Sequence, residues 1–227
     1  MTIIYRILCL LGGYCFGMIQ TSYIYGRMNG IDIREHGSGN AGTTNALRVL
    51  GKKAGIIVFF GDLLKAVLAT VIARLIFNNI CPENVYMYIA YTGLGVVLGH
   101  NFPFYLKFRG GKGIAATGGV IVGFLDPIMI LSAAIVFFGL CILTKYVSMA
   151  SICLVTMFFV EYTVFALKGN YSFVMDNPDS KAAMIESIII VGFMTVMAIY
   201  RHKANIIRLI NHEENKLFSG KKKESDN

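Results

Sequence analysis

The sequence has no tryptophan, only four prolines and few charges, because Asp, Glu, Lys and Arg make up 15% of its 227 residues. Soluble domains have about 25% charged residues, so a soluble globule of this size would lack the charges to cover its surface. Disorder is excluded more firmly, since 56% of the residues are hydrophobic. These shortages leave a small polytopic membrane protein with a single domain over residues 1–227.

Metal-ligand and disulfide patterns are also missing. The five cysteines, at positions 9, 15, 81, 141 and 153, form no C-x-x-C pair, and no histidine stands at ligand spacing. Four of these cysteines lie in apolar runs, where cysteine behaves as a small hydrophobic residue. The sequence therefore predicts no metal, no disulfide framework and no cofactor.

Long hydrophobic runs are present instead. They lie at about 3–25, 54–77, 84–101, 114–143, 147–167 and 184–200. Runs of about 20 apolar residues are helices that cross the hydrocarbon core, whereas a β-barrel would show alternating segments of about 10 residues. The first run is followed by no small-x-small cleavage site, so we expect an uncleaved first span. The predicted fold class is an all-α bundle.

The net charge of +8 comes from 21 basic and 13 acidic residues. Lys and Arg collect at 26–53, at 102–113 and after 200, whereas 78–83 has none. Basic loops of membrane proteins face the cytoplasm, which accounts for the charge better than a nucleic-acid partner does. We therefore expect these three segments in the cytoplasm, including a basic tail over 201–227, and the N-terminus outside.

This sidedness requires an even number of crossings between residues 113 and 201. The long run 114–143 is interrupted by Leu125-Asp126-Pro127, and Pro and Asp both disfavour a continuous span. A split there predicts an external turn at 124–127 and seven transmembrane helices in total. Five or six spans are the alternatives, because 114–123 is short for a crossing.

Three polar segments stand out, and the first runs from His36 to Arg48 with the sequence H-G-S-G-N-A-G-T-T-N-A-L-R. Glycines let backbone N–H groups turn inward around an anion, and Ser, Thr and Asn add neutral donors. A helix starting near Asn45 would also favour an anion at its N-terminus. An ordinary glycine-rich turn is the alternative reading.

The second segment joins G-H-N-F-P at 99–103 to K-F-R-G-G-K-G at 107–113. Lys112, flanked by Gly110, Gly111 and Gly113, is suited to close contact with phosphate. Lys107 and Arg109 fit better as positive charges on lipid headgroups. The neighbouring Phe102, Pro103, Phe104 and Phe108 are expected to be interfacial anchors.

The third segment begins the tail, where His202, Asn205 and Arg208 repeat every three residues. This spacing places the three side chains on one helix face. A basic amphipathic helix on the membrane surface is the alternative, but it leaves His202 and Asn205 unexplained. Inside the second span, Asp62 and Lys65 also share a face, so we expect a local ion pair that supports the site, with a proton relay as the alternative.

At these segments the chain resembles the bacterial PlsY family of glycerol-3-phosphate acyltransferases, which use acyl phosphate as donor. The matching motifs are S-G-N-x-G-x-x-N-x-x-R from Ser38, G-H-x-F-P with G-G-K from Gly99, and H-x-x-N-x-x-R-L from His202. The third motif usually has glycine where this chain has His212. The resemblance implies a compact seven-helix bundle in the bacterial cell membrane with its active site on the cytoplasmic side.

The resemblance also implies the reaction. An acyl group passes from acyl phosphate to the 1-hydroxyl of glycerol 3-phosphate, giving lysophosphatidic acid and inorganic phosphate. A soluble enzyme that forms acyl phosphate is the implied partner. The residues implied around glycerol 3-phosphate are Ser38, Arg48, Lys52, Lys112, His202 and Asn205. The loop implied to hold the phosphate of the donor, together with Lys112, comprises Gly39, Asn40, Gly42, Thr44 and Asn45.

The residues fit this chemistry. Acyl phosphate is a mixed anhydride with a good leaving group, so no covalent intermediate is required. No histidine is followed by an aspartate five residues later, so the sequence does not indicate a general base formed by a His–Asp pair. We expect direct attack by the glycerol hydroxyl, with Ser38, Lys112, His202 and Asn205 as the catalytic residues and a substrate phosphate or His202 as proton acceptor. A small transporter for phosphorylated metabolites is the competing function, although its polar sites would lie at the membrane midplane.

Overall fold

The computed structural model describes residues 2–171, 173–174 and 176–217, so the end of the predicted tail lies outside the described residues. Every regular element in this part of the chain is helical. The α-helices are α1 (Thr2–Gly17), α2 (Thr21–Met28), α3 (Thr43–Leu50), α4 (Lys52–Ile80), α5 (Val85–Asn101), α6 (Ile114–Gly123), α7 (Pro127–Thr144), α8 (Val147–Leu167), α9 (Pro178–Arg201) and α10 (Lys203–Ile210). Three short 3-10 turns are η1 (Ile33–Glu35), η2 (Pro82–Asn84) and η3 (Phe104–Leu106). The predicted all-α class is confirmed.

Five segments of the described chain are long and apolar enough to cross a membrane: Ile3–Met28, Lys52–Ile80, Pro127–Thr144, Val147–Leu167 and Pro178–Arg201. Their outward faces carry large hydrophobic side chains such as Ile72, Ile142 and Ile189, as expected where lipid is the solvent. The chain is therefore a multi-pass membrane protein. α5 has 17 residues and α6 has 10, so seven crossings stays a prediction.

The break at Asp126-Pro127 is present. Asp126 caps α7, because its side chain accepts from the N–H groups of Ile128 (2.9 Å) and Met129 (3.1 Å). On α4, Arg74 donates to the Phe124 carbonyl at 2.9 Å. Arg74 lies six residues, or about 9 Å, before the end of α4 at Ile80. The turn between α6 and α7 therefore sits level with the last turns of α4 rather than beyond its end.

Glycines allow α1 and α5 to touch through their backbones. A Cβ atom on Gly13 would lie 2.1 Å from the Thr92 carbonyl oxygen, and one on Gly99 would lie 2.2 Å from that of Tyr14. Small residues four apart permit this approach between membrane helices. The contact fixes the C-terminal end of α5, where the second polar segment begins.

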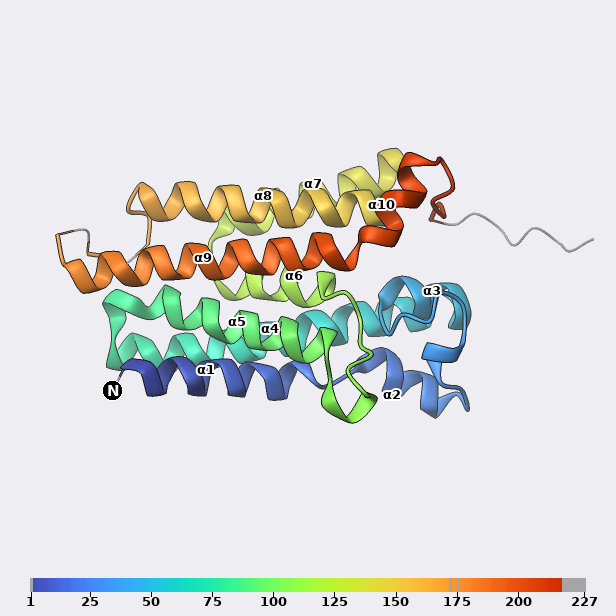
Figure 1. Cartoon of the computed structure of the whole chain (residues 1–227), viewed down its shortest axis with the longest axis horizontal. Helices are drawn as coiled ribbons and strands as arrows, with labels where there is room; N and C mark the ends of the chain where they lie inside the picture. The colour runs from blue at the N-terminus through green and yellow to red at the C-terminus, as the bar shows by residue number, and fades with distance from the viewer. Residues whose placement is uncertain (1, 172, 175, 218–227) are drawn as a thin grey trace, which may run out of the picture.

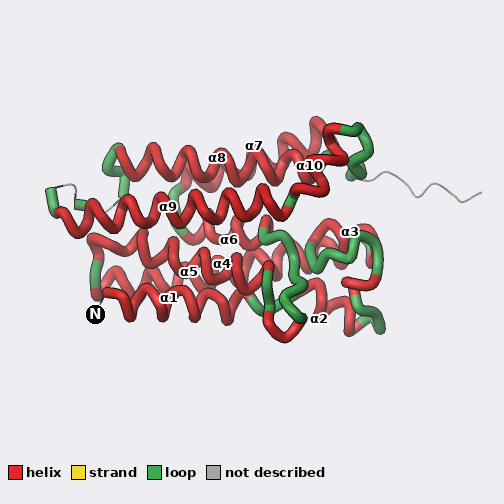
Figure 2. The backbone as a smooth tube through the Cα atoms, in the orientation of Figure 1, coloured by secondary structure: helices red, strands yellow, loops and turns green. Residues whose placement is uncertain are grey.

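The three polar segments gather at one end of the bundle. Figure 1 shows α2, α3 and α10 at the end opposite the N-terminus, with the loop after α5 beside them. In Figure 2 much of the loop backbone lies at that end, between helices that run lengthwise. The first predicted span is not continuous, since α1 ends at Gly17 and α2 starts at Thr21. This arrangement brings motifs far apart in sequence to one surface.

Candidate active site

The glycine-rich segment forms a loop that leads into α3. Gly37 and Gly39 have φ of +61° and +69°, a left-handed conformation that favours glycine. The Asn45 side chain, which is 2% exposed, donates to the carbonyls of Ile33 (3.1 Å) and His36 (3.0 Å) and accepts from the Ser38 N–H (2.9 Å). Asn45, predicted to bind substrate, thus shapes the loop with its amide.

The backbone amides that follow are free. In the described part of the chain, the N–H groups of residues 40–44, including those of Asn40, Gly42 and Thr44, donate no hydrogen bond. They lie in the loop and at the start of α3, where the partial positive charge of the helix adds to them. Consecutive free amides of this kind form an anion site. The predicted anion cradle therefore has the donors that it needs.

The Gly110–Gly111 turn has its polar backbone groups occupied. The N–H of Gly110 donates to the Asn101 carbonyl (3.2 Å) and that of Gly111 to the His100 carbonyl (3.1 Å). Arg201 Nη2 donates to the carbonyls of Gly111 (2.8 Å) and Gly110 (3.4 Å). Because their own groups are paired, the two glycines hold Lys112 in place rather than offering amides to a substrate.

Lys112 meets the third segment directly. Its Nζ donates to Asn205 Oδ1, and Asn205 Nδ2 donates to Glu214 Oε1 at 2.8 Å. Glu214 Oε2 accepts from Arg208 Nε at 2.8 Å. The four side chains form one connected network in which Glu214 restrains both Asn205 and Arg208. Two residues of the predicted face, Asn205 and Arg208, are thus joined through Glu214, and Asn205 contacts the second segment through Lys112.

The chain returns to this network through the end of α10. His212 has φ of +58°, its N–H donates to Leu209 O (3.2 Å), and the next N–H donates to Arg208 O (2.7 Å). This pair of bonds is a Schellman ending, which favours glycine at its left-handed position. His212 occupies that position in this chain, and the turn directs Glu214 back onto Asn205.

His202 is 4% exposed at the junction of α9 and α10. Its Nδ1 lies 2.8 Å from the Ala198 carbonyl, so Nδ1 carries the hydrogen and Nε2 keeps its lone pair. Burial lowers the pKa of His202 to about 4, and the positive charge of Lys112 also lowers it. The imidazole is therefore neutral at physiological pH.

Burial likewise lowers the pKa of Lys112 to about 8, an effect that Glu214 opposes and that Arg208, Arg201 and Arg48 reinforce. A lysine with this pKa remains mostly charged at pH 7. A bound phosphate dianion would favour the charged form of the lysine still further. Several cations surround one carboxylate here. The site therefore has an excess of positive charge suited to anionic substrates.

The first two segments are in contact as well. A Cβ atom on Gly111 would lie 2.9 Å from the Ala41 carbonyl oxygen, so the free amides lie beside the Lys112 turn. Ser38, Thr44 and Arg48 are exposed on the same loop and α3, and Lys52 is exposed where α4 begins. Among them, Arg48 acts on Lys112 through its positive charge, which helps to lower the pKa of Lys112.

Lys107 and Arg109 lie elsewhere. They line a cavity of about 260 Å³ together with Asp32, Arg34, Glu35, Tyr105 and Leu106. Lys112 is not part of it. Phe104 and Phe108 are 59% and 60% exposed, as expected of anchors, whereas Pro103 is buried, so the prediction that Pro103 is an anchor is wrong.

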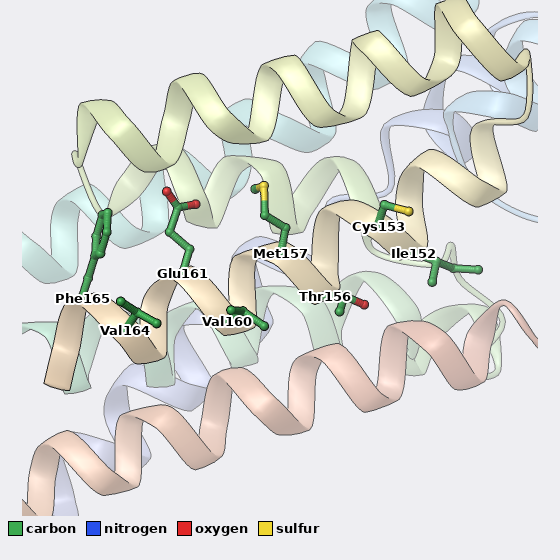
Figure 3. A pocket seen from close by; sticks show the side chains of 8 residues that line it. All are labelled: Ile152, Cys153, Thr156, Met157, Val160, Glu161, Val164 and Phe165. Carbon is green, nitrogen blue, oxygen red and sulfur yellow. The ribbon is translucent and has the colours of Figure 1, made fainter.

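A second hollow, of about 540 Å³, runs along α8. Figure 3 shows its side chains on α8, with α7 and α9 on either side. It is lined by Ile152, Cys153, Thr156, Met157, Val160, Glu161, Val164 and Phe165. Glu161 accepts from Ser132 at 2.8 Å. None of these residues belongs to the three polar segments, so the groove is separate from the candidate site.

Arg201 and Glu214 are the site residues that the sequence reasoning did not assign. Arg201 directly precedes His202, and Glu214 lies beyond the repeating face of α10. Their motif context is the only sequence signal for them. Among the described residues no group of three His, Cys, Asp or Glu side chains is placed to hold a metal ion.

Comparisons with known proteins find a matching family. The family model described as glycerol-3-phosphate acyltransferase matches residues 7–212. A glycerol-3-phosphate acyltransferase of Bacillus subtilis (strain 168) is 41% identical over 211 residues, covering 92% of this chain and 96% of that protein. One of Clostridioides difficile (strain 630) is 39% identical over 213 residues, covering 93% and 94%.

A solved structure is similar as well. The crystal structure of PlsY (YgiH), an integral membrane glycerol 3-phosphate acyltransferase, in its glycerol 3-phosphate form, has a TM-score of 0.76 at 30% identity. It covers 93% of this chain and 95% of its own. The lysophosphatidic acid form of PlsY gives a TM-score of 0.74. With the motifs, their contacts and the matches all in agreement, the chain belongs to the PlsY family of glycerol-3-phosphate acyltransferases.

Proposed function

We propose that this acyltransferase takes its acyl group from acyl phosphate and transfers it to the 1-hydroxyl of glycerol 3-phosphate. The products are lysophosphatidic acid and inorganic phosphate. The observation that carries the proposal is the meeting of two anion-binding features at Gly111, namely the free amides of residues 40–44 and the Lys112 network. Two phosphorylated substrates need two such features side by side.

The assignment of the two features follows from their chemistry. Backbone amides at the start of α3 suit the donor phosphate, whose charge grows as it leaves. Lys112, Arg48, Lys52 and Arg208 suit glycerol 3-phosphate, with His202 and Asn205 beside them. The two forms in which PlsY was solved, with glycerol 3-phosphate and with lysophosphatidic acid, correspond to the acceptor and the product of this reaction.

Transfer proceeds by direct attack. The hydroxyl oxygen of glycerol 3-phosphate bonds to the acyl carbonyl carbon, and the bond from that carbon to the phosphate oxygen breaks. Ser38 orients the hydroxyl from the loop, where its own side chain makes no hydrogen bond among the described residues. Asn205 acts by holding Lys112 through its Oδ1. Proximity and orientation supply most of the rate, because the leaving group is already good.

The proton goes to a substrate phosphate. Phosphate monoesters have a second pKa of about 6, whereas the pKa of the buried His202 is about 4. Of two acceptors, the one with the higher pKa takes the proton more readily. His202 contributes its Nε2 lone pair as a hydrogen-bond acceptor beside the site.

The reaction takes place on the cytoplasmic side of the bacterial cell membrane. Support comes from the basic residues of the three segments, which share one end of the bundle (Figure 1). The lipid bilayer then holds the acyl chain of the donor and of the product. A soluble enzyme that forms acyl phosphate is the expected source of the donor.

A comparison of two acyl donors, each given separately, tests the proposal. Purified full-length protein in lipid nanodiscs is given labelled glycerol 3-phosphate with either palmitoyl phosphate or palmitoyl-CoA, and lysophosphatidic acid is quantified. We expect product and inorganic phosphate in equal amounts from palmitoyl phosphate. The coenzyme donor should give none, since the loops of the described chain are too short for a separate nucleotide surface. Equal rates with both donors would overturn the donor assignment.

A further inference from the structure

A buried polar cluster lies beneath the turn that carries Lys112. Asp62 and Lys65 on α4 and His100 near the end of α5 are 1%, 4% and 3% exposed. Lys65 Nζ lies 2.9 Å from Asp62 Oδ1 and 3.0 Å from His100 Nδ1, so the predicted ion pair is confirmed and has a third member. Charges inside a membrane are costly and are usually kept for a function.

The same cluster holds the break between α1 and α2. Lys65 Nζ donates to the carbonyls of Gly17 (3.1 Å) and Ile19 (2.6 Å), which the interrupted helix leaves without backbone partners. Thr21 donates to Asp62 Oδ1 at 3.2 Å. Three membrane segments therefore meet at one buried ion pair.

The ion pair also sets the orientation of the His100 ring. A lysine ammonium can only donate, so His100 Nδ1 accepts from it and the ring hydrogen is on Nε2. The distance of 3.6 Å from Nδ1 to Asp62 Oδ1 is too long for a hydrogen bond. Nε2 lies against the Gly110–Gly111 turn, because a Cβ atom on Gly111 would be 2.0 Å from it. Gly111 thus rests directly on the ring.

We propose that Asp62, Lys65 and His100 are positioning residues for Lys112. The ion pair sets the orientation of the His100 ring, and the ring supports the backbone of Gly111. The position of Gly111 in turn determines where the Lys112 side chain begins and how it reaches the substrate phosphate. The inference rests on the role given to Lys112 above. In this proposal the intramembrane charges of Asp62 and Lys65 hold a loop at the membrane surface in position and do not transport protons.

The test compares two matched double variants of the full-length protein in nanodiscs. Asp62→Asn/Lys65→Met removes both charges of the cluster, so that no buried charge is left unpaired. Arg6→Met/Glu186→Gln likewise removes a pair, joined at 2.7 Å between α1 and α9, that has no contact with the site. We expect the first to lower kcat/KM for glycerol 3-phosphate by about tenfold to a hundredfold, the effect of misplacing a catalytic group by about 1 Å. The second should change thermal stability but leave kcat/KM about the same.

Coupling to Lys112 distinguishes positioning from a general structural role. In a Lys112→Ala background, Asp62→Asn/Lys65→Met should cause little further loss, because residues that act through one group are not additive. His100→Gln, which keeps a nitrogen where Nε2 lies, should retain more activity than His100→Asn. Full additivity, or an equal loss in the Arg6/Glu186 control, would overturn the proposal. Rates are compared with whichever acyl donor the wild-type protein uses, so failure of the donor assignment does not affect this test.

Discussion

At the scale of single residues, Lys112 should be the lysine on which activity depends most. Removing a charge-assisted contact to an anion costs about 1.5–3 kcal/mol, which is about one to two decades in rate. Lys112→Ala should therefore lose most of its turnover while the bundle stays folded. Lys112→Arg should restore little, since a planar guanidinium is a poor replacement in a turn held tightly by glycines.

Lys107→Ala is the control for Lys112→Ala, because Lys107 lies in the same loop but lines a different cavity. It should lose several-fold less activity in the same acyl-transfer assay. If both variants were equally damaged, the loop would act through its total charge, and the specific role of Lys112 would be wrong.

The titration of Lys112 predicts the alkaline side of the pH profile. Because burial lowers its pKa to about 8, the free enzyme loses the ammonium as pH rises through that value. The kcat/KM for glycerol 3-phosphate should therefore fall above about pH 8. His202, whose pKa is about 4, is neutral from pH 6 upward and adds no step there. A kcat/KM that stays flat to pH 10 in initial-rate measurements would contradict a charged Lys112.

Some residues of the site could be predicted from the sequence and others could not. Lys112, Asn205 and Arg208 stand in motifs whose spacing and glycine content already indicate phosphate contact, and the structure joins them. Glu214 and Arg201 act through partners far along the chain or across a helix end. No periodic pattern in the neighbouring sequence indicates such contacts. The role of Asn45 in shaping the loop was likewise invisible, because a buried asparagine and a substrate ligand look the same in sequence.

At the scale of helices, neighbouring glycines in α1 give a matched pair. A Cβ atom on Gly13 would lie 2.1 Å from the Thr92 carbonyl oxygen, whereas one on Gly12 meets nothing within 4 Å. Gly13→Ala should destabilise the bundle by about 1–3 kcal/mol through overpacking. Gly12→Ala should be neutral or stabilising by about 0.5–1 kcal/mol. Thermal unfolding in detergent measures both, and equal stabilities would show that α1 and α5 are not in backbone contact.

Of the two helix breaks described above, one could be predicted from the sequence and the other could not. Asp126-Pro127 combines a capping side chain with a residue suited to the first helical turn, so the end of the α6 segment could be located. The break after Gly17 lies in Met18-Ile19-Gln20, which contains neither proline nor a turn pair. It is stabilised by Lys65 from α4, and a distant partner of this kind leaves no mark on the local sequence.

At the scale of the whole molecule, the predicted sidedness depends on how the hairpin of α6 and α7 lies in the membrane. α6 is about 15 Å long, half of the hydrocarbon thickness of about 30 Å. If the hairpin of α6 and α7 crosses twice or turns back within the membrane, the chain returns to the side from which it started. We therefore expect the loop at 102–113 and α10 to share a face.

Thiol labelling tests this sidedness. A cysteine at position 107 and another at position 203 should both react with a membrane-impermeant reagent only after the cytoplasmic face is opened. The parent protein, with its five free cysteines, gives the background. Labelling of the two positions from opposite faces would mean that an odd number of crossings separates them.

The contact between Lys112 and Asn205 joins residues 93 positions apart, and this separation has a consequence for biogenesis. Asn205 is synthesised only after α7, α8 and α9, and Glu214 follows it. A partly made chain has the glycine loop and the lysine but not the group that holds the lysine in place. Catalytic competence is therefore acquired last, and turnover can report the completion of membrane assembly more sensitively than helix content.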